Sequence, residues 1–329
     1  MQLMQDWLSE VLGSSGFELS PASADASFRR YFRVRHPGGS HIVMDAPPEK
    51  EDVRPFVAVA ERLREIGVHV PQIHARDEAR GLLLLDDLGE CSYLSALDAG
   101  SVERLYGDAL GTLAVIQACG PRGDELPAYD RRLLLEEMGL FRDWLLGRQL
   151  GIELGAEDAQ RLEASFERLA GVALEQPQVC VHRDFHSRNL MVTERHNPGV
   201  LDFQDAVIGP VTYDLVSLLR DCYIAWPRQQ VEDWAFGYRE LACQSGVLHE
   251  DEVDEATFLR WFDWMGVQRH LKAAGIFARL GLRDAKPGYL ADIPRTLGYV
   301  AEVAPAYAEL EWLGRLIAER VLPALEVPA

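Results

Sequence analysis

Three polar side chains in one stretch of the chain have the types and the spacing that phosphoryl transfer requires. Asp184 and Asn189 lie five residues apart, and Asp202 follows thirteen residues after Asn189. A carboxylate can accept the proton of an attacking hydroxyl, and an amide with a second carboxylate can hold a magnesium ion between phosphates. The reaction needs in-line positioning and cations more than covalent help from the protein. The ordered set therefore predicts a kinase that uses ATP and Mg²⁺.

Short apolar segments flank these side chains and are expected to position them. Gln178–Val181 predicts a strand that leads into the first loop, and residues 190–192 and 199–201 predict two more strands. A hairpin between these last two would bring Asn189 and Asp202 close together. Two ordinary β-turns with polar tips would give the same local pattern, so the prediction depends on the complete ordered set.

The motifs around these residues resemble the aminoglycoside phosphotransferase and choline kinase-like family, which is a branch of the protein kinase fold. The resemblance lies in His-Arg-Asp-Phe-His-x-x-Asn at 182–189, Leu-Asp-Phe-Gln-Asp at 201–205, and Ile-Gly-Pro-Val-Thr-Tyr-Asp-Leu at 208–215. It implies a two-lobed α+β fold. A small lobe with an antiparallel sheet would occupy residues 1–88, and a larger, mainly helical lobe would occupy residues 89–329.

The family pattern also implies roles for individual residues. It makes Asp184 the catalytic base and His186 a contact to the γ-phosphate, although a histidine in a surface loop would look the same. It makes Asn189 and Asp202 the metal ligands. Asp214 would brace the catalytic loop, or would cap the helix that follows it.

In the kinase arrangement, the turn at residues 21–28 takes the place of the loop that covers the phosphates. The turn contains no glycine, and Ser27 is its predicted contact to phosphate, with a plain hairpin turn as the alternative. The buried strand that ends at Leu85 corresponds to the hinge. We therefore predict that the backbone of Asp86 and Leu88 binds adenine and that Leu85 lines the pocket. A strand followed by an Asp-rich turn would explain the same local pattern.

The expected third strand, His41–Asp45, departs from the kinase pattern. It has no lysine to contact the α- and β-phosphates and to pair with a glutamate of the next helix, such as Glu61. Lys50, Arg30 or Arg33 could take its place, since an arginine can bind phosphate through two donors. Lys50 could equally be a solvated surface charge. Because this lysine is missing, the alternative is a nucleotide-binding pseudokinase that acts as a regulator or a scaffold.

The predicted helix 257–280 carries a stripe that begins apolar and becomes polar and basic, through Gln268, Lys272 and Arg279. The neighbouring stripe is apolar and should pack inward. The polar stripe could line a cleft that receives an anion, or it could be a boundary row of long side chains on an amphipathic helix.

The segment around this stripe, together with residues 283–295 and 43–49, resembles one particular branch of this family. It is similar to the anomeric sugar kinases of bacterial cell-wall recycling, which phosphorylate N-acetylmuramate and N-acetylglucosamine at the C1 hydroxyl. In that branch the missing lysine would be normal. The resemblance predicts a small amino-sugar substrate bound by Gln268, Arg269, Lys272 and Arg279. A kinase of an aminoglycoside, choline or another small alcohol is the alternative.

Composition favours a cytoplasmic enzyme. The chain has 329 residues, 48% of them hydrophobic, which is enough for a large core in two lobes. A formal charge of −19 disfavours nucleic acid and anionic membrane as partners. The five scattered cysteines form no Cys-x-x-Cys pair, and no apolar run approaches the length of a membrane span. We infer no obligate protein partner.

Overall fold

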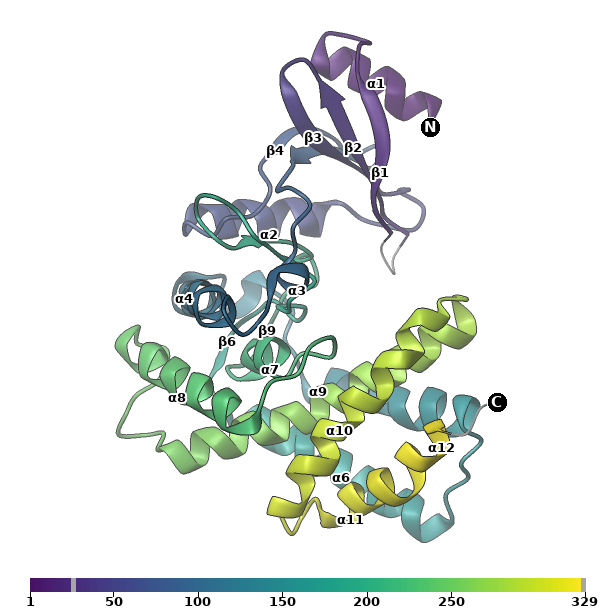
Figure 1. Ribbon diagram of the computed structural model, residues 1–329, viewed down its shortest axis with the longest axis vertical. Helices are drawn as coiled ribbons and strands as arrows, with labels where there is room; N and C mark the ends of the chain where they lie inside the picture. Colours follow the sequence, from purple (N-terminus) through teal and green to yellow (C-terminus); the bar gives the residue numbers. More distant parts are fainter. Residues whose placement is uncertain (25–27, 327–329) are drawn as a thin grey trace.

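A five-stranded antiparallel sheet forms the N-terminal lobe, above a larger helical lobe (Figure 1). The computed structural model describes residues 1–24 and 28–326. The strand order is β1-β2-β3-β5-β4. The strands are β1 Glu18–Ala24, β2 Arg30–His36, β3 Gly39–Asp45, β4 Ile73–Asp77 and β5 Leu82–Asp86. This architecture confirms the predicted kinase-like, two-lobed α+β fold.

Helices on both faces of the sheet explain the run of four leucines in β5. Leu82 and Leu84 join a core beneath helix α1 (Gln2–Leu12), while Leu83 and Leu85 join the main core, which includes helix α2 (Arg54–Glu65). Successive side chains of a strand point to opposite faces, so a strand that is covered on both sides must be apolar throughout.

The C-terminal lobe is built around one long, buried helix, α9 (Glu255–Arg283). Its close packing depends on Gly275, because a Cβ there would lie 2.3 Å from the carbonyl carbon of Leu140. The other helices are α3 Tyr93–Ala96, α4 Val102–Cys119, α5 Arg131–Leu140, α6 Ala156–Glu175, α7 Tyr213–Leu219, α8 Arg228–Gln244, α10 Ile293–Val303, α11 Glu311–Leu316 and α12 Leu322–Glu326. None of the helices in the described ranges combines the length and hydrophobicity needed to cross a membrane.

Two small two-stranded sheets hold the loops that carry the chemistry. β6 (Gln178–Val181) pairs with β9 (Val207–Pro210), and β7 (Leu190–Met191) pairs with β8 (Gly199–Val200). The second pair is the predicted hairpin, with Leu190 opposite Val200. Helix α5 passes directly into a π-helical segment, Phe141–Gln149.

Candidate active site

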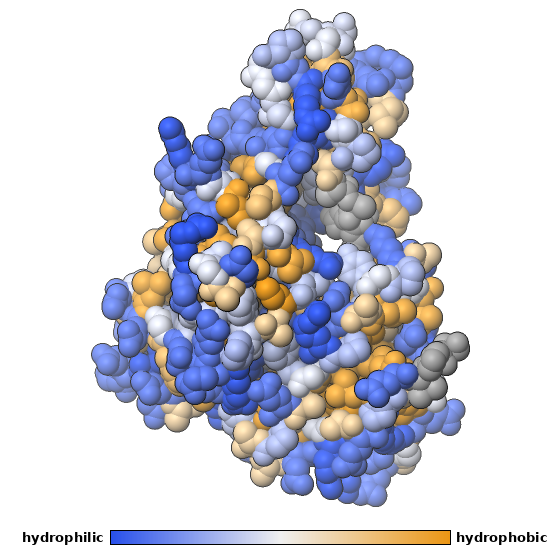
Figure 2. Space-filling model, viewed as in Figure 1, coloured by the Kyte–Doolittle hydropathy of each residue, from blue (hydrophilic) through white to orange (hydrophobic). Residues whose placement is uncertain are grey.

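A cleft of about 1070 Å³ lies between the two lobes, and its walls come from both. Figure 2 shows a hollow in the molecular surface between the two lobes. The sheet contributes side chains from β2, β3 and β5, and the helical lobe contributes the loops around β7 and β8 together with α9. Asp184, His186, Asn189 and Asp202 all line this cleft.

The three side chains with the predicted spacing meet in the folded chain. The Asn189 Nδ2 lies 3.0 Å from the carbonyl oxygen of Asp184 and 3.3 Å from Oδ2 of Asp202. The backbone N–H of Leu201 donates to the carbonyl of Asn189 across 2.9 Å, so the two loops are joined along the β7–β8 hairpin. The predicted juxtaposition of Asn189 and Asp202 is present in the structure.

Strained backbone turns these side chains into the cleft. Arg183 has a φ of 76° and Asp202 a φ of 64°, in the left-handed region that costs free energy for residues with a Cβ. Such conformations persist only where the surroundings enforce them, and they concentrate at functional sites. The two strained residues lie in the loops that carry Asp184 and Asp202.

Two buried carboxylates brace the loop that carries Asp184. Asp214 accepts hydrogen bonds from the backbone N–H groups of His182 (2.6 Å) and Arg183 (2.9 Å). Asp221 accepts one from the backbone N–H of Ser187 across 2.9 Å. Asp214 lies in the first turn of α7, and its carboxylate reaches the loop rather than capping its own helix. This contact is the brace that the family pattern implied.

The surroundings of Asp184 keep its carboxylate ionised. Burial by itself raises the pKa of Asp184, but the fields of Lys272, His186 and Arg269 outweigh it, so the pKa lies below its ordinary value.

The residues present fit a magnesium ion. Both amide protons of Asn189 are directed to oxygens, those of the Asp184 carbonyl and of Asp202, so its own Oδ1 is the atom left for a cation. Gln204 Nε2 holds Oδ1 of Asp202 at 2.8 Å. Oxygen donors from an amide and a carboxylate, few in number, match a Mg²⁺ ion that is shared with phosphate oxygens and water.

His186 occupies a buried position on the cleft wall, against the ring of Tyr223 at 5.4 Å between centroids. Its Nδ1 has no hydrogen-bond partner among the described residues. Burial lowers the pKa of His186, so the ring is neutral near pH 7 and can offer one N–H. These facts are compatible with the predicted phosphate contact.

The predicted adenine site lies at the end of β5. Leu85, Asp86 and Leu88 all line the cleft. The backbone N–H of Asp86 already donates to the carbonyl of Gln72 across 3.0 Å, which leaves the Asp86 carbonyl as its group for adenine. Ser27, the predicted phosphate contact, lies outside the described residues.

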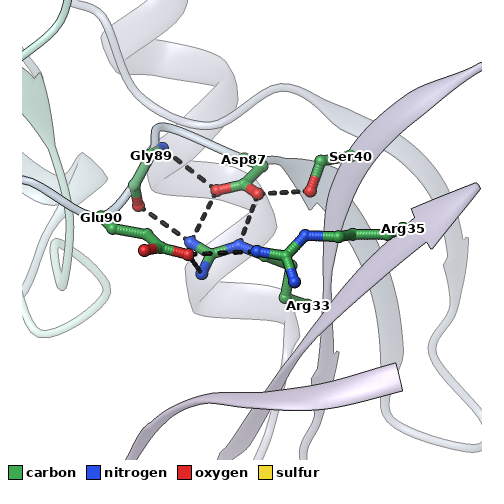
Figure 3. A network of polar contacts seen from close by, with 6 residues as sticks. All are labelled: Arg33, Arg35, Ser40, Asp87, Gly89 and Glu90. Atoms are coloured by element: carbon green, nitrogen blue, oxygen red, sulfur yellow. Dashed lines mark hydrogen bonds and ion pairs between the residues drawn. The ribbon is translucent and has the colours of Figure 1, made fainter. Parts of the chain in front are cut away.

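Arg33 fixes the hinge to the sheet (Figure 3). Its Nε lies 2.7 Å from Oδ2 of Asp87, and its guanidinium also contacts the Gly89 carbonyl and Glu90. Both Arg33 and Asp87 are largely buried. This arginine is therefore occupied at the end of the cleft next to β5, where adenine is predicted to bind.

The other two candidates for the missing lysine are directed elsewhere. Arg30 is exposed and pairs with Asp45, and Lys50 lies over the ring of Phe28, 4.2 Å from its centroid. On β3, Ile42 lines the cleft, whereas Met44 is fully buried in the core. Glu61 pairs with Arg76 on the surface.

Helix α9 brings three of its four predicted residues to the cleft. Arg269, Lys272 and Arg279 line it. Gln268 does not: it is fully buried, and its Nε2 lies 3.3 Å from the hydroxyl of Tyr129. The face of α9 toward the cleft runs through Arg269, Lys272 and Ile276, so Gln268 is the one of the four that this face leaves out, and its substrate contact stays a prediction.

An aromatic wall beside His186 was not predicted. Tyr223, Phe277 and Tyr289 line the cleft, with 6.1 Å between the first two ring centroids and 5.6 Å between the last two. The guanidinium of Arg188 lies 3.5 Å from the Tyr223 centroid. Only Arg188 had a signal in the sequence, since it belongs to the catalytic motif.

Arg29 was also missed, although the sequence held a signal for it. Strand alternation places positions 29, 31 and 33 on one face, and Arg29, Tyr31 and Arg33 all line the cleft. The same alternation turns Arg30 away. Strand alternation could thus have identified Arg29, rather than Arg30, as a candidate cation.

The fold and this site define a phosphotransferase with a protein kinase-like architecture. Residues 18–247 match the model of the phosphotransferase enzyme family, and the chain belongs to that family. It is 49% identical over 301 residues to a protein of Pseudomonas aeruginosa named N-acetylmuramate/N-acetylglucosamine kinase, with 92% of this chain and 88% of the relative aligned. A protein of the same name from Neisseria meningitidis is 45% identical, with 97% of this chain and 95% of the relative aligned.

Solved structures with little sequence similarity share the fold. An ethanolamine kinase of Plasmodium vivax superposes with a TM-score of 0.66 at 10% identity, covering 90% of this chain and 86% of that one. A choline kinase of Streptococcus pneumoniae superposes with a TM-score of 0.63 at 13% identity, covering 92% and 98%. These likenesses concern the fold alone.

Proposed function

We propose that this protein is an ATP-dependent sugar kinase that phosphorylates the anomeric C1 hydroxyl of N-acetylmuramate and N-acetylglucosamine. The observation that carries the proposal is the meeting of Asp184, Asn189 and Asp202 in one cleft. The names of the bacterial relatives support the choice of sugar. Released C1-phosphate sugars would enter peptidoglycan recycling in the cytoplasm.

Asp184 accepts the proton of the C1 hydroxyl as the phosphoryl group is transferred. Its depressed pKa keeps it unprotonated at neutral pH, and a hemiacetal hydroxyl is acidic enough for a weak base. Asn189 and Asp202 hold Mg²⁺, which when bound offsets the charge of the phosphates. His186 donates a hydrogen bond to the γ-phosphate from its neutral ring.

The nucleotide lies against β5, with adenine at the Asp86 carbonyl and the Leu88 backbone and with Leu85 beside the ring. The sugar lies at the other end of the cleft. There the wall of Tyr223, Phe277 and Tyr289 offers a flat apolar surface to one face of the ring.

Cations around the acceptor end favour an anionic or neutral sugar over a cationic acceptor. Arg269 is buried, and its guanidinium contacts the Cys222 thiol at 3.6 Å, while its Nε has no hydrogen-bond partner in the described part of the chain. We assign Arg269 to sugar oxygens near C1 and Arg279 to the lactyl carboxylate of muramate. An aminoglycoside or choline would bring positive charge against these groups.

Turnover with four acceptors tests the proposal. ADP release is measured with MgATP and N-acetylmuramate, N-acetylglucosamine, kanamycin or choline. Release that depends on either amino sugar is expected. ADP release with kanamycin or choline alone would rule out an amino sugar as the acceptor. ATP binding without ADP release in any of the four reactions would favour the pseudokinase.

A further inference from the structure

The end of the cleft that binds the metal requires a cation from the N-terminal lobe. A nucleotide phosphate chain carries more negative charge than one Mg²⁺ neutralises, and in this fold a strand lysine usually supplies the rest. Here β3 presents Ile42 and the buried Met44, and Arg33 is held at the hinge.

Arg29 lies where that cation is needed. It immediately precedes β2, its side chain is 11% exposed, and it lines the cleft. A terminal nitrogen of its guanidinium lies 4.0 Å from Oδ1 of Asp202, the proposed metal ligand. The sheet thus places a mostly buried cation opposite the loop that holds the metal.

We propose that Arg29 binds the phosphate chain of the nucleotide in place of the strand lysine. This inference rests on the proposed nucleotide-dependent function. The separation from Asp202 is longer than a hydrogen bond, so this contact is one of charge. A guanidinium matches phosphate through two parallel N–H groups, which an ammonium cannot do.

The Arg29–Asp202 contact also suggests an exchange of partners. Without nucleotide, the two charges partly compensate each other, with the Arg29 side chain 11% exposed and the Asp202 side chain 32% exposed. With Mg²⁺ and the phosphates present, Asp202 would hold the cation and Arg29 would hold the phosphates. Each charge therefore keeps an opposite partner in both states, which avoids the cost of an isolated buried charge.

Calorimetric titration with adenosine, AMP and MgADP tests the proposal without any acceptor sugar. Arg29→Ala should weaken MgADP binding by about tenfold or more, the effect of losing a charge-assisted hydrogen bond, and leave adenosine binding unchanged. Arg29→Lys should recover part of the loss. Arg30→Ala is the matched control, because Arg30 is the neighbouring arginine and pairs with Asp45 on the surface. It should bind all three ligands like the wild type.

Two results would overturn the assignment: unchanged MgADP affinity in Arg29→Ala, or an equal loss for adenosine and MgADP, which would indicate a general disturbance of the lobe. Thermal unfolding of each variant verifies that it is folded. A wild-type protein that binds MgADP through Arg29 but phosphorylates no sugar would support this inference while rejecting the proposed function.

Discussion

The Nζ of Lys272 lies 3.0 Å from Oε1 of Glu137, and this ion pair joins α9 to α5 at the catalytic loop. Glu137 also pairs with Arg183, the residue before Asp184, and accepts a hydrogen bond from Tyr129. Lys272 in turn donates to the Tyr213 hydroxyl across 2.8 Å. Helix α9 and the loop that carries Asp184 are thus joined through one buried carboxylate.

Removing one charge of the Lys272–Glu137 ion pair should destabilise the folded protein. Lys272→Met leaves Glu137 with less compensating charge in a buried site, and we expect it to lower the free energy of unfolding by about 3 kcal/mol. Glu137→Gln/Lys272→Met removes both charges and should lose less than the sum of the single changes. Denaturant unfolding of the four proteins measures this coupling. Strict additivity would show that the pair does not stabilise the lobe.

Asp184→Asn should abolish the base while preserving the fold, since asparagine has nearly the same shape. We expect kcat to fall about 10²–10⁴-fold, the usual weight of general base catalysis, with MgADP affinity retained. Steady-state kinetics and calorimetry provide the two readouts. Wild-type turnover in this variant would remove Asp184 from the mechanism.

Arg279→Ala should change the KM for N-acetylmuramate more than the KM for N-acetylglucosamine. The side chain lines the cleft, and burial and the neighbouring Arg283 lower its pKa, so the site favours an anionic partner. The KM for N-acetylmuramate should rise about tenfold, whereas that for N-acetylglucosamine, which lacks a carboxylate, should change little.

Arg283→Ala is the matched control for that experiment. Arg283 is exposed and pairs with Asp284 at 2.7 Å, outside the cleft lining. It should leave both KM values unchanged. An equal rise for both sugars in Arg279→Ala would mean that this arginine does not recognise the carboxylate.

Buried histidines should make stability fall in acid. Burial lowers the pKa of His182 to about 4 and that of His270 to about 3. The unfolded chain binds these protons below about pH 6.5 and the folded chain does not, so each histidine lowers the free energy of unfolding by about 1.4 kcal/mol per pH unit as pH falls from there toward 4.

His270→Gln isolates this effect, because His270 lies away from the cleft and stacks on Tyr299. The variant should lose less stability than the wild type between pH 7 and pH 5, as measured by denaturant unfolding. Parallel pH profiles for the two proteins would contradict the assigned pKa shift.

The sequence was sufficient to predict the parts of the site that are local. Asp184, Asn189 and Asp202 meet because short strands and turns place them, and their spacing encodes those elements. The buried strand that ends at Leu85 and the helix α9 were likewise predicted from their apolar patterns, whereas the hinge comes from the family resemblance and stays a prediction. The division between residues 88 and 89 stays a prediction.

The rest depended on long-range packing. Gln268 and Arg269 are neighbours on α9, and the packing of this helix against the rest of the lobe, which includes the close approach of Gly275 to Leu140, places Arg269 but not Gln268 in the cleft wall. Tyr223 and Tyr289 come from separate loops and meet through tertiary folding. Buried partners such as Glu137 gave no local signal, since a helical glutamate usually lies on the surface.

The most direct test of the central claim is phosphorus NMR of the product formed from MgATP and N-acetylglucosamine labelled with ¹³C at C1. We predict a sugar phosphate whose phosphorus couples to the labelled carbon, formed by the wild type and formed far more slowly by Asp184→Asn. A product phosphorylated at another hydroxyl, or no sugar phosphate from either amino sugar, would contradict the account.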